Sequence, residues 1–249
     1  MRKSLLLLPL AILACSAPSQ TPTRSFNQTL LQTIKTFPTG GGYSGTDATK
    51  NLLPLASQPT PDGLLIIPTT ARPSFCSGAT YLAFLQTLNT LSPLQHPLST
   101  KLAVATDQQD GHGIFGRWNA NGPGCAKLIA DLNLGTNFTK LENAQPGDFL
   151  KIWWTEHIGK RERGHHVVYL SHTPTTLTFW SSNQPHGYGQ KTVPLTNCKR
   201  LLFTRITKPQ NITNALTLTP TDPYLASMLT KDHTWPSILK KTKTKTKTQ

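Results

Sequence analysis

The sequence has 249 residues, with 25 Lys and Arg against 11 Asp and Glu, so that its formal net charge is +14. Charged residues make up 14% of the chain and hydrophobic residues 37%, which excludes a coiled coil, a collagen-like fibre and a polytopic membrane protein. Its four cysteines are too few for a disulfide-built fold, and its length suits one domain of moderate size with tails.

The N-terminus has the pattern of an export signal. Basic residues at 2–3 precede an apolar stretch at 5–13 and small residues before a cysteine, which is typical of a cleaved leader and not of a spanning helix. The tetrapeptide Ile-Leu-Ala-Cys that ends at Cys15 resembles the bacterial lipobox, in which the cysteine is lipidated and becomes the new N-terminus. An ordinary cleaved signal peptide is the alternative.

The lipobox resemblance implies a division of the first 25 residues. Residues 1–14 are then a lipoprotein signal peptide, and residues 15–25 are the lipidated N-terminus and a linker. Ser16 is compatible with sorting to an outer membrane. We therefore expect an exported protein that is lipid-anchored to the bacterial envelope, at the outer membrane and facing the periplasm.

The next part of the chain favours helices. Apolar residues recur every three or four positions over 26–37 and over 74–91, and Pro93 ends the second of these patterns. A further helix is predicted over 124–132, and a short apolar run at 64–67 is compatible with a strand.

The pattern then changes to short segments rich in Val, Ile, Thr and aromatic residues, separated by turn residues. These segments are 147–154, 165–171, 176–182 and 200–206. They predict consecutive antiparallel strands. The predicted fold class is therefore α+β, with helices packed against one face of an antiparallel sheet.

The C-terminus alternates lysine and threonine over residues 240–247. Such a run of like charges repels itself and builds no core, so we predict a disordered basic tail at 236–249. The tail is either simply solvated or adheres to anionic envelope polymers. The remaining basic residues form no stripe and an exported protein meets little nucleic acid, so no nucleic-acid partner is expected. Residues 26–235 are left as the functional domain.

Cys76 is the first candidate for chemistry, because it opens the strongest predicted helix. Unpaired backbone N–H groups and the helix dipole stabilise an anion there and favour a thiolate. A small buried cysteine is an equally acceptable interpretation of this position alone. The pairing of Cys125 with Cys198 also stays open, because a sequence does not show the distance between two cysteines.

Two adjacent histidines are candidates for the base that a thiolate needs. His165 and His166 open one predicted strand, and alternation sends their side chains to opposite faces, so that at most one faces Cys76. If the following hairpin is centred near residues 173–175, the numbers of paired residues add up to 348 or 349, which places Ser182 or Asn183 opposite His166. The spacing thus allows a Cys–His–Asn triad.

Metal binding is the competing interpretation of the histidines. The chain has no Cys-x-x-Cys or His-x-x-x-His pair to support it, so neither a metal nor a cofactor is expected.

Three motifs, in this order, resemble the NlpC/P60 superfamily of papain-like cell-wall cysteine peptidases. They are Cys-Ser-Gly at 76–78, Ala-Gln-Pro-Gly-Asp-Phe-Leu at 144–150 and His-Val-Val-Tyr-Leu at 166–170. The resemblance covers about residues 72–206. It implies a papain-like fold in which the helix bearing the nucleophile packs on an antiparallel sheet, and hydrolysis of amide bonds in peptidoglycan stem peptides.

The same resemblance implies roles for individual residues. Cys76 is the nucleophile and His166 the base. Asn183 is chosen as the third member, because an amide oxygen orients an imidazole, while Ser182 remains possible by hairpin register. Tyr43 is the candidate for an upstream tyrosine that helps to bind the oxyanion, and a turn aromatic that packs on the domain is its alternative.

The chain also departs from the family pattern. Phe75 stands where the family commonly has Asp, and Val168 stands where it often has Gly. The stretch at 92–141 is longer than expected, and its segment 107–113 is either a binding rim or a solvated loop. Two alternatives therefore stay open, which are a catalytically silent wall-binding lipoprotein and a papain-like amidase or acyltransferase with another substrate.

Overall fold

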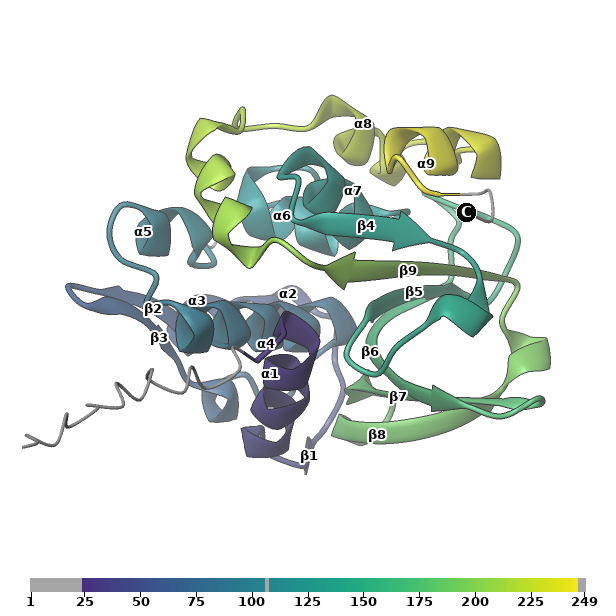
Figure 1. Cartoon of the computed structure of the whole chain (residues 1–249), viewed down its shortest axis with the longest axis horizontal. Coiled ribbons are helices and arrows are strands. Elements are labelled where there is room, and N and C mark those ends of the chain that lie inside the picture. Colours follow the sequence, from purple (N-terminus) through teal and green to yellow (C-terminus); the bar gives the residue numbers. More distant parts are fainter. Residues whose placement is uncertain (1–23, 106–107, 246–249) are drawn as a thin grey trace, which may run out of the picture.

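A seven-stranded sheet lies at the centre of the protein, in a computed structural model that describes residues 24–105 and 108–245 (Figure 1). Every pair of neighbouring strands is antiparallel, in the order β1-β8-β7-β6-β5-β9-β4. The strands are β1 Gly40–Gly41, β4 Gly135–Phe138, β5 Phe149–Trp153, β6 Gly164–His172, β7 Thr176–Asn183, β8 Gly187–Pro194 and β9 Arg200–Ile206. The strands β2 Ser57–Thr60 and β3 Gly63–Ile66 form a separate hairpin.

Helices flank the sheet and join its strands. The α-helices are α1 Phe26–Thr33, α2 Asp47–Lys50, α3 Leu53–Ala56, α4 Cys76–Leu91, α5 Leu98–Leu102, α6 Gly113–Asn119, α7 Gly124–Asp131, α8 Pro223–Ala226 and α9 Trp235–Lys241. Short 3₁₀ segments are η1 Ile34–Thr36, η2 Pro68–Thr70, η3 Leu141–Asn143, η4 Leu195–Asn197, η5 Pro209–Thr217 and η6 Ser227–Leu229. The predicted α+β class with an antiparallel sheet is confirmed.

The sequence prediction and the sheet differ in strand order. The predicted helices appear as α1, α4 and α7, and the predicted strands as β3, β5, β6, β7 and β9. However, β9 pairs with β5 instead of following β7, because β8 takes the place next to β7. The strand β8 escaped prediction because it contains Gly187, Gly189 and Pro194, residues that are typical of turns.

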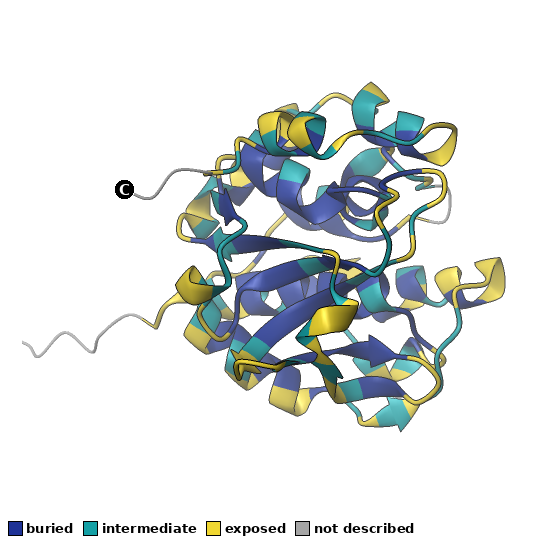
Figure 2. Ribbon diagram, turned by 90° about the vertical axis from the view of Figure 1, so that its right-hand side faces the viewer, coloured by how far each residue is buried: buried dark blue, intermediate teal, exposed yellow. Residues whose placement is uncertain are grey.

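Helix α4 is the central element of the main hydrophobic core. Most of its side chains are buried on all sides, and it packs between α1 and the strands β6 and β7. Phe84 and Trp118 stack in this core with ring centroids 4.8 Å apart. The opposite face of the curved sheet encloses a second cluster, which includes Phe179 and Phe203. Figure 2 shows the central strands as buried and the exposed residues on the surrounding loops and short helices. The packing of α4 against α1, β6 and β7 fixes the position of its first residue, Cys76.

The C-terminal segment is ordered as far as residue 245, which corrects the prediction of a disordered tail at 236–249. Helix α9 packs beside the outer strand β4 (Figure 1). Ile238 and Thr242 are fully buried, and the backbone N–H of Lys245 donates to the carbonyl of Asn137 in β4. These contacts hold part of the Lys-Thr run despite its charge. The last four positions, 246–249, lie outside the described residues.

The N-terminal predictions concern a part of the chain that the structure does not describe. The signal peptide, Cys15 and most of the linker lie within residues 1–23, outside the described residues. In the part of the chain that is described, no helix combines the length and the apolar character that crossing a bilayer needs.

Candidate active site

Cys76 is the first residue of α4 and faces a cleft of about 660 Å³. The preceding Phe75 is extended and makes no side-chain cap, so the first N–H groups of the helix have no capping side chain. The thiol is half-buried. Its position at the positive end of the longest helix of the domain is the one that the sequence predicted.

The surroundings of Cys76 favour its thiolate. Burial alone raises the pKa of the thiol, but the charge of His165 and a hydrogen bond from its ring, together with the backbone N–H of His166, lower the pKa to about 6. The ammonium group of Lys151 contributes in the same direction. At neutral pH Cys76 is therefore mainly an anion, which is the reactive form of a cysteine.

Asn183 orients the imidazole of His165. The distance between His165 Nε2 and Asn183 Oδ1 is 3.0 Å. The amide nitrogen of Asn183 donates to the carbonyls of Ser181 and Gly189, which leaves its oxygen to face the histidine. An amide oxygen only accepts hydrogen bonds, so Nε2 carries the proton and Nδ1 is left for exchange with the thiol. The side chains of Cys76, His165 and Asn183 thus form a Cys–His–Asn chain.

His166 is not the partner of Cys76, which corrects the sequence prediction. Its ring lies on the face of the sheet that α4 covers, with Nδ1 2.7 Å from Oγ1 of Thr80. Thr80 lies four residues after Cys76, which is about 6 Å further along the helix. The histidine that points into the seam between helix and sheet therefore meets the second turn of α4. The thiol at the helix end meets His165 instead.

The chemistry of His166 also argues against a role as base. Its ring is buried between Trp118 and Phe149. Burial, followed by the charges of Lys151 and His165, lowers the pKa of His166 well below its ordinary value. A neutral imidazole held in this way positions the N-terminal turns of α4, because the Thr80 hydroxyl also lies 3.0 Å from the carbonyl of Cys76.

Sheet register decides between Ser182 and Asn183. Val168 pairs with Trp180, so that the numbers of paired residues add up to 348 on the side of the cleft. Extending this register by three residues brings Asn183 opposite His165, in agreement with the hydrogen bond between their side chains. Beyond a bulge at Tyr169 the sum becomes 349. The predicted Asn183 is therefore brought to the site, although its partner is His165.

Ser182 lies on the other face of the sheet from Asn183. Its buried hydroxyl accepts a hydrogen bond of 2.8 Å from the hydroxyl of Ser74. Ser74 stands two residues before Cys76, so this contact supports the chain that leads into the nucleophile. Ser182 makes no contact with the ring of His165 among the hydrogen bonds described for the site.

Tyr43 is brought to the thiol, as the sequence predicted. Its hydroxyl hydrogen-bonds Cys76, and the charge of Cys76, followed by burial, raises the pKa of Tyr43. The phenol is therefore a donor at neutral pH. The backbone of Tyr43 donates to Pro185, and the run Gly40, Gly41 and Gly42 before it has positive φ angles of 73°, 91° and 82°. These left-handed conformations explain why glycine is needed ahead of the tyrosine.

An ion pair that the sequence did not predict lies in the wall of the cleft. Lys151 Nζ lies 2.6 Å from Oε1 of Glu162, whose side chain is only 3% exposed. The second carboxylate oxygen of Glu162 accepts from Trp153 Nε1 and from the backbone of Gly122 and Gly159. Lys151 is the one charged residue in the otherwise apolar strand β5, and this is the sequence signal that could have marked it as a residue of the cleft.

The segment at 107–113, for which a binding rim and a solvated loop were both left open, contributes Asp110 to the wall of the cleft. The carboxylate of Asp110 lines the cleft and accepts from Asn119 Nδ2 at 2.8 Å and from the backbone N–H of Asn121 at 3.1 Å. Burial raises the pKa of Asp110 above its ordinary value. Residue 107 itself lies outside the described part.

Comparison with known proteins gives no relative. No family model, curated protein or solved structure matches the chain.

Cys125 and Cys198, whose pairing was left open, are both free thiols. Within residues 24–105 and 108–245, no three His, Cys, Asp or Glu side chains gather in a way that would hold a metal ion.

Proposed function

We propose that this protein is a papain-like cysteine hydrolase of the NlpC/P60 type that cleaves amide bonds in peptidoglycan stem peptides. The observation that supports it most is the meeting of the Cys76 thiol, with its pKa lowered to about 6, and an imidazole held by an amide oxygen. The three motifs of the sequence support the substrate class. The leader that resembles a lipobox supports export and anchoring through Cys15, where the wall is accessible.

The reaction proceeds in two halves. The thiolate of Cys76 attacks the carbonyl carbon of the amide, and a C–S bond forms while the carbonyl oxygen takes the negative charge. The imidazolium of His165 then gives its proton to the leaving amine as the C–N bond breaks, which leaves a thioester. His165 next takes a proton from water, and the hydroxide attacks the thioester carbon. The C–S bond then breaks, and the carboxylic acid leaves as the thiolate of Cys76 and the imidazolium of His165 are restored.

Two donors are placed to stabilise the oxyanion. The backbone N–H of Cys76 belongs to the first turn of α4, where N–H groups have no acceptor within the helix. The hydroxyl of Tyr43 reaches the same sulfur. An oxyanion hole needs donors at about 2.7–3.1 Å from the developing charge, and these two groups flank the position of attack.

Mass spectrometry of purified peptidoglycan tests the proposal. The wild-type protein is expected to release new fragments whose masses identify the cleaved bond, and Cys76→Ala is expected to release none. Cys198→Ala is the matched control, because burial raises the pKa of this second half-buried thiol to about 11, and it should retain the activity.

Other outcomes of the same experiment point to the alternatives. If the folded wild-type protein binds peptidoglycan and releases no fragment, a catalytically silent wall-binding lipoprotein is favoured. If Cys76 becomes acylated and the acyl group moves to an acceptor other than water, the protein is an acyltransferase. Equal fragment release by Cys76→Ala and wild type would show that Cys76 is not the nucleophile.

A further inference from the structure

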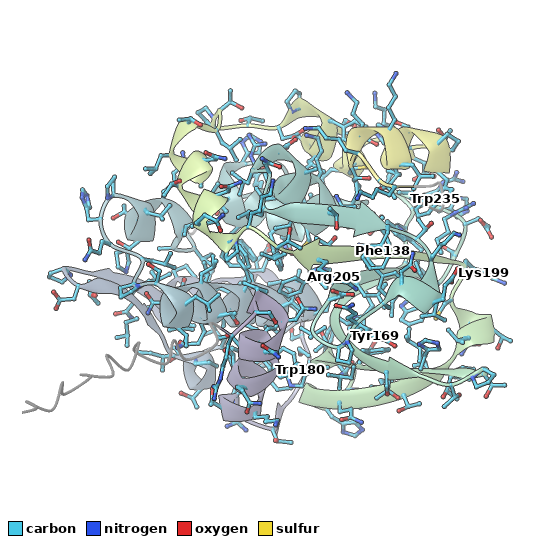
Figure 3. All side chains as sticks on the ribbon, viewed as in Figure 1. Phe138, Tyr169, Trp180, Lys199, Arg205 and Trp235 are labelled. Atoms are coloured by element: carbon cyan, nitrogen blue, oxygen red, sulfur yellow. The ribbon has the colours of Figure 1, made fainter. Side chains whose placement is uncertain are left out.

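A tryptophan flanked by two basic residues runs across three strands beside the candidate active site. Trp154 directly follows β5, and its N–H donates to the carbonyl of Arg163, which precedes β6. On the other side, the N–H of Lys199 donates to the carbonyl of Trp153 as β9 begins. We call Lys199, Trp154 and Arg163 the basic row. Figure 3 labels Lys199 at the end of the sheet where β9 starts.

Strand geometry places the basic row on the same face as His165. Side chains two residues apart along a strand share a face, so Arg163 and His165 point to the same side of the sheet. The rings of Trp154 and His165 have centroids 6.3 Å apart. The row is therefore next to the imidazole of the triad, on the side away from α4.

A second hollow connects the basic row with the cleft. This hollow has a volume of about 490 Å³ and is lined by Thr155, Thr196 and Asn197 in addition to the three residues of the row. It shares Trp154, Arg163 and Val193 with the cleft that contains Cys76. A substrate that occupies the cleft is thus able to continue over Trp154 into the second hollow.

The charges of the row lack carboxylate partners in the part of the chain that the structure describes. Arg163 and Lys199 are exposed, and no described Asp or Glu lies within salt-bridge distance of either side chain. The two nearest glutamates along the chain are engaged elsewhere, since Glu162 turns inward to Lys151 and Glu156 pairs with Arg200. The second hollow therefore presents positive charge without an internal counter-charge.

We propose that the basic row is a substrate subsite that binds a carboxylate of the peptide next to the scissile amide. Arg163 offers the planar fork that matches a carboxylate, Lys199 adds a second positive charge, and Trp154 contacts the apolar part of the same unit. This inference rests on the proposed function for the identity of the substrate. It goes beyond it in naming the residues that select an acidic peptide over a neutral one.

Binding to the Cys76→Ala protein tests the subsite without turnover. The ligands are a tetrapeptide stem released from peptidoglycan, with its carboxylates free, and the same peptide with its carboxylates converted to carboxamides. Calorimetry should show weaker binding of the carboxamide peptide. Because charge-assisted contacts at an exposed site are screened, Arg163→Gln should weaken the acidic peptide about tenfold and Lys199→Gln about threefold. Lys35 is an exposed basic residue on η1, far from the basic row in the sequence. Lys35→Gln is therefore the matched control and should change the affinity for neither peptide.

The comparison of the two peptides distinguishes this inference from the proposed function. Three results would overturn the subsite. The acidic and the carboxamide peptide could bind with equal affinity, or the acidic peptide could fail to bind. Arg163→Gln could also weaken the binding of both peptides equally. A preference for the acidic peptide that Arg163→Gln removes would support the subsite even if the wild type cleaves no amide. In an active wild-type background, the same substitution should raise KM for the acidic peptide and leave kcat unchanged.

Discussion

Replacing His165 by Gln should remove the electrostatic support of the Cys76 thiolate. The lowering of the Cys76 pKa from 9.0 to about 6 is worth roughly 4 kcal/mol of thiolate stabilisation. Burial raises the pKa, so without the charge of His165 we expect the thiol to return to 9 or above. At pH 6 the thiolate fraction would then fall from about one half to about 0.001, which is roughly 500-fold.

The observable rate falls less than the thiolate fraction. A thiolate of higher pKa is a better nucleophile, and three pKa units offset the loss by roughly 20-fold. The rate of alkylation by iodoacetamide at pH 6 should therefore drop about 25-fold in His165→Gln, and the midpoint of the pH profile should move from about 6 to 9 or above. Cys198 and Cys125 remain protonated at this pH because burial raises the pKa of each.

Peptide mapping by mass spectrometry measures this rate at Cys76 itself. His172→Gln is the matched control, since His172 lies on the same strand and is exposed at its far end. It should keep the wild-type profile. A midpoint that stays near 6 in His165→Gln would refute the assignment of His165 as the partner of the thiol, and the same shift in His172→Gln would show that the effect is not local.

Two further predictions concern stability. Burial lowers the pKa of His166 well below its ordinary value of 6.5. As the pH falls below 6.5, the unfolded chain therefore binds a proton at this histidine that the folded chain does not bind. The free energy of unfolding should then decrease by up to roughly 1.4 kcal/mol per pH unit. Urea denaturation between about pH 4.5 and 7.5 should show a smaller slope for His166→Gln, and an unchanged slope would contradict a buried neutral imidazole. Glu162→Ala leaves Lys151 without its partner in the cleft wall and should lower the free energy of unfolding by about 3 kcal/mol. The exposed Glu142→Ala should cost less than about 0.5 kcal/mol, and an equal loss in both variants would count against the ion pair.

The sequence predicted the elements that carry the site because their patterns are strong. The apolar spacing over 74–91 and the proline after it produced a helix that starts at Cys76, as expected. Alternation also separated His165 from His166 correctly onto opposite faces. These features depend on local periodicity, which a single sequence records well.

The choice of the histidine failed because it depends on contacts that periodicity does not record. His166 was chosen because it opens the motif that resembles the His-Val of the family, but Cys76 lies at the helix end, beyond the seam that His166 enters. The bulge at Tyr169 changes the pairing by one residue, and a hairpin centre alone does not locate a bulge. The sequence therefore placed Asn183 beside a histidine of the cleft, but beside His166 where the structure has His165.

The C-terminal prediction failed for a different reason. Composition favoured disorder over 236–249, yet two apolar residues anchor the start of this region. Trp235 packs edge-on against Trp153 with ring centroids 5.6 Å apart, and Ile238 is fully buried. A few apolar contacts of this kind outweigh the repulsion between exposed lysines, which water and salt screen.

The covering of β4 by the C-terminal segment has a consequence for the behaviour of the sheet toward other molecules. An outer strand with free N–H and C=O groups is a template for pairing with another chain, and long bare edges promote aggregation. Here Lys245 pairs with β4, and Asn137 of that strand binds the carbonyl of Thr242. The opposite edge, β1, is only two residues long. Both margins of the sheet, as far as residues 24–105 and 108–245 define them, are thus protected against strand-to-strand association with another chain.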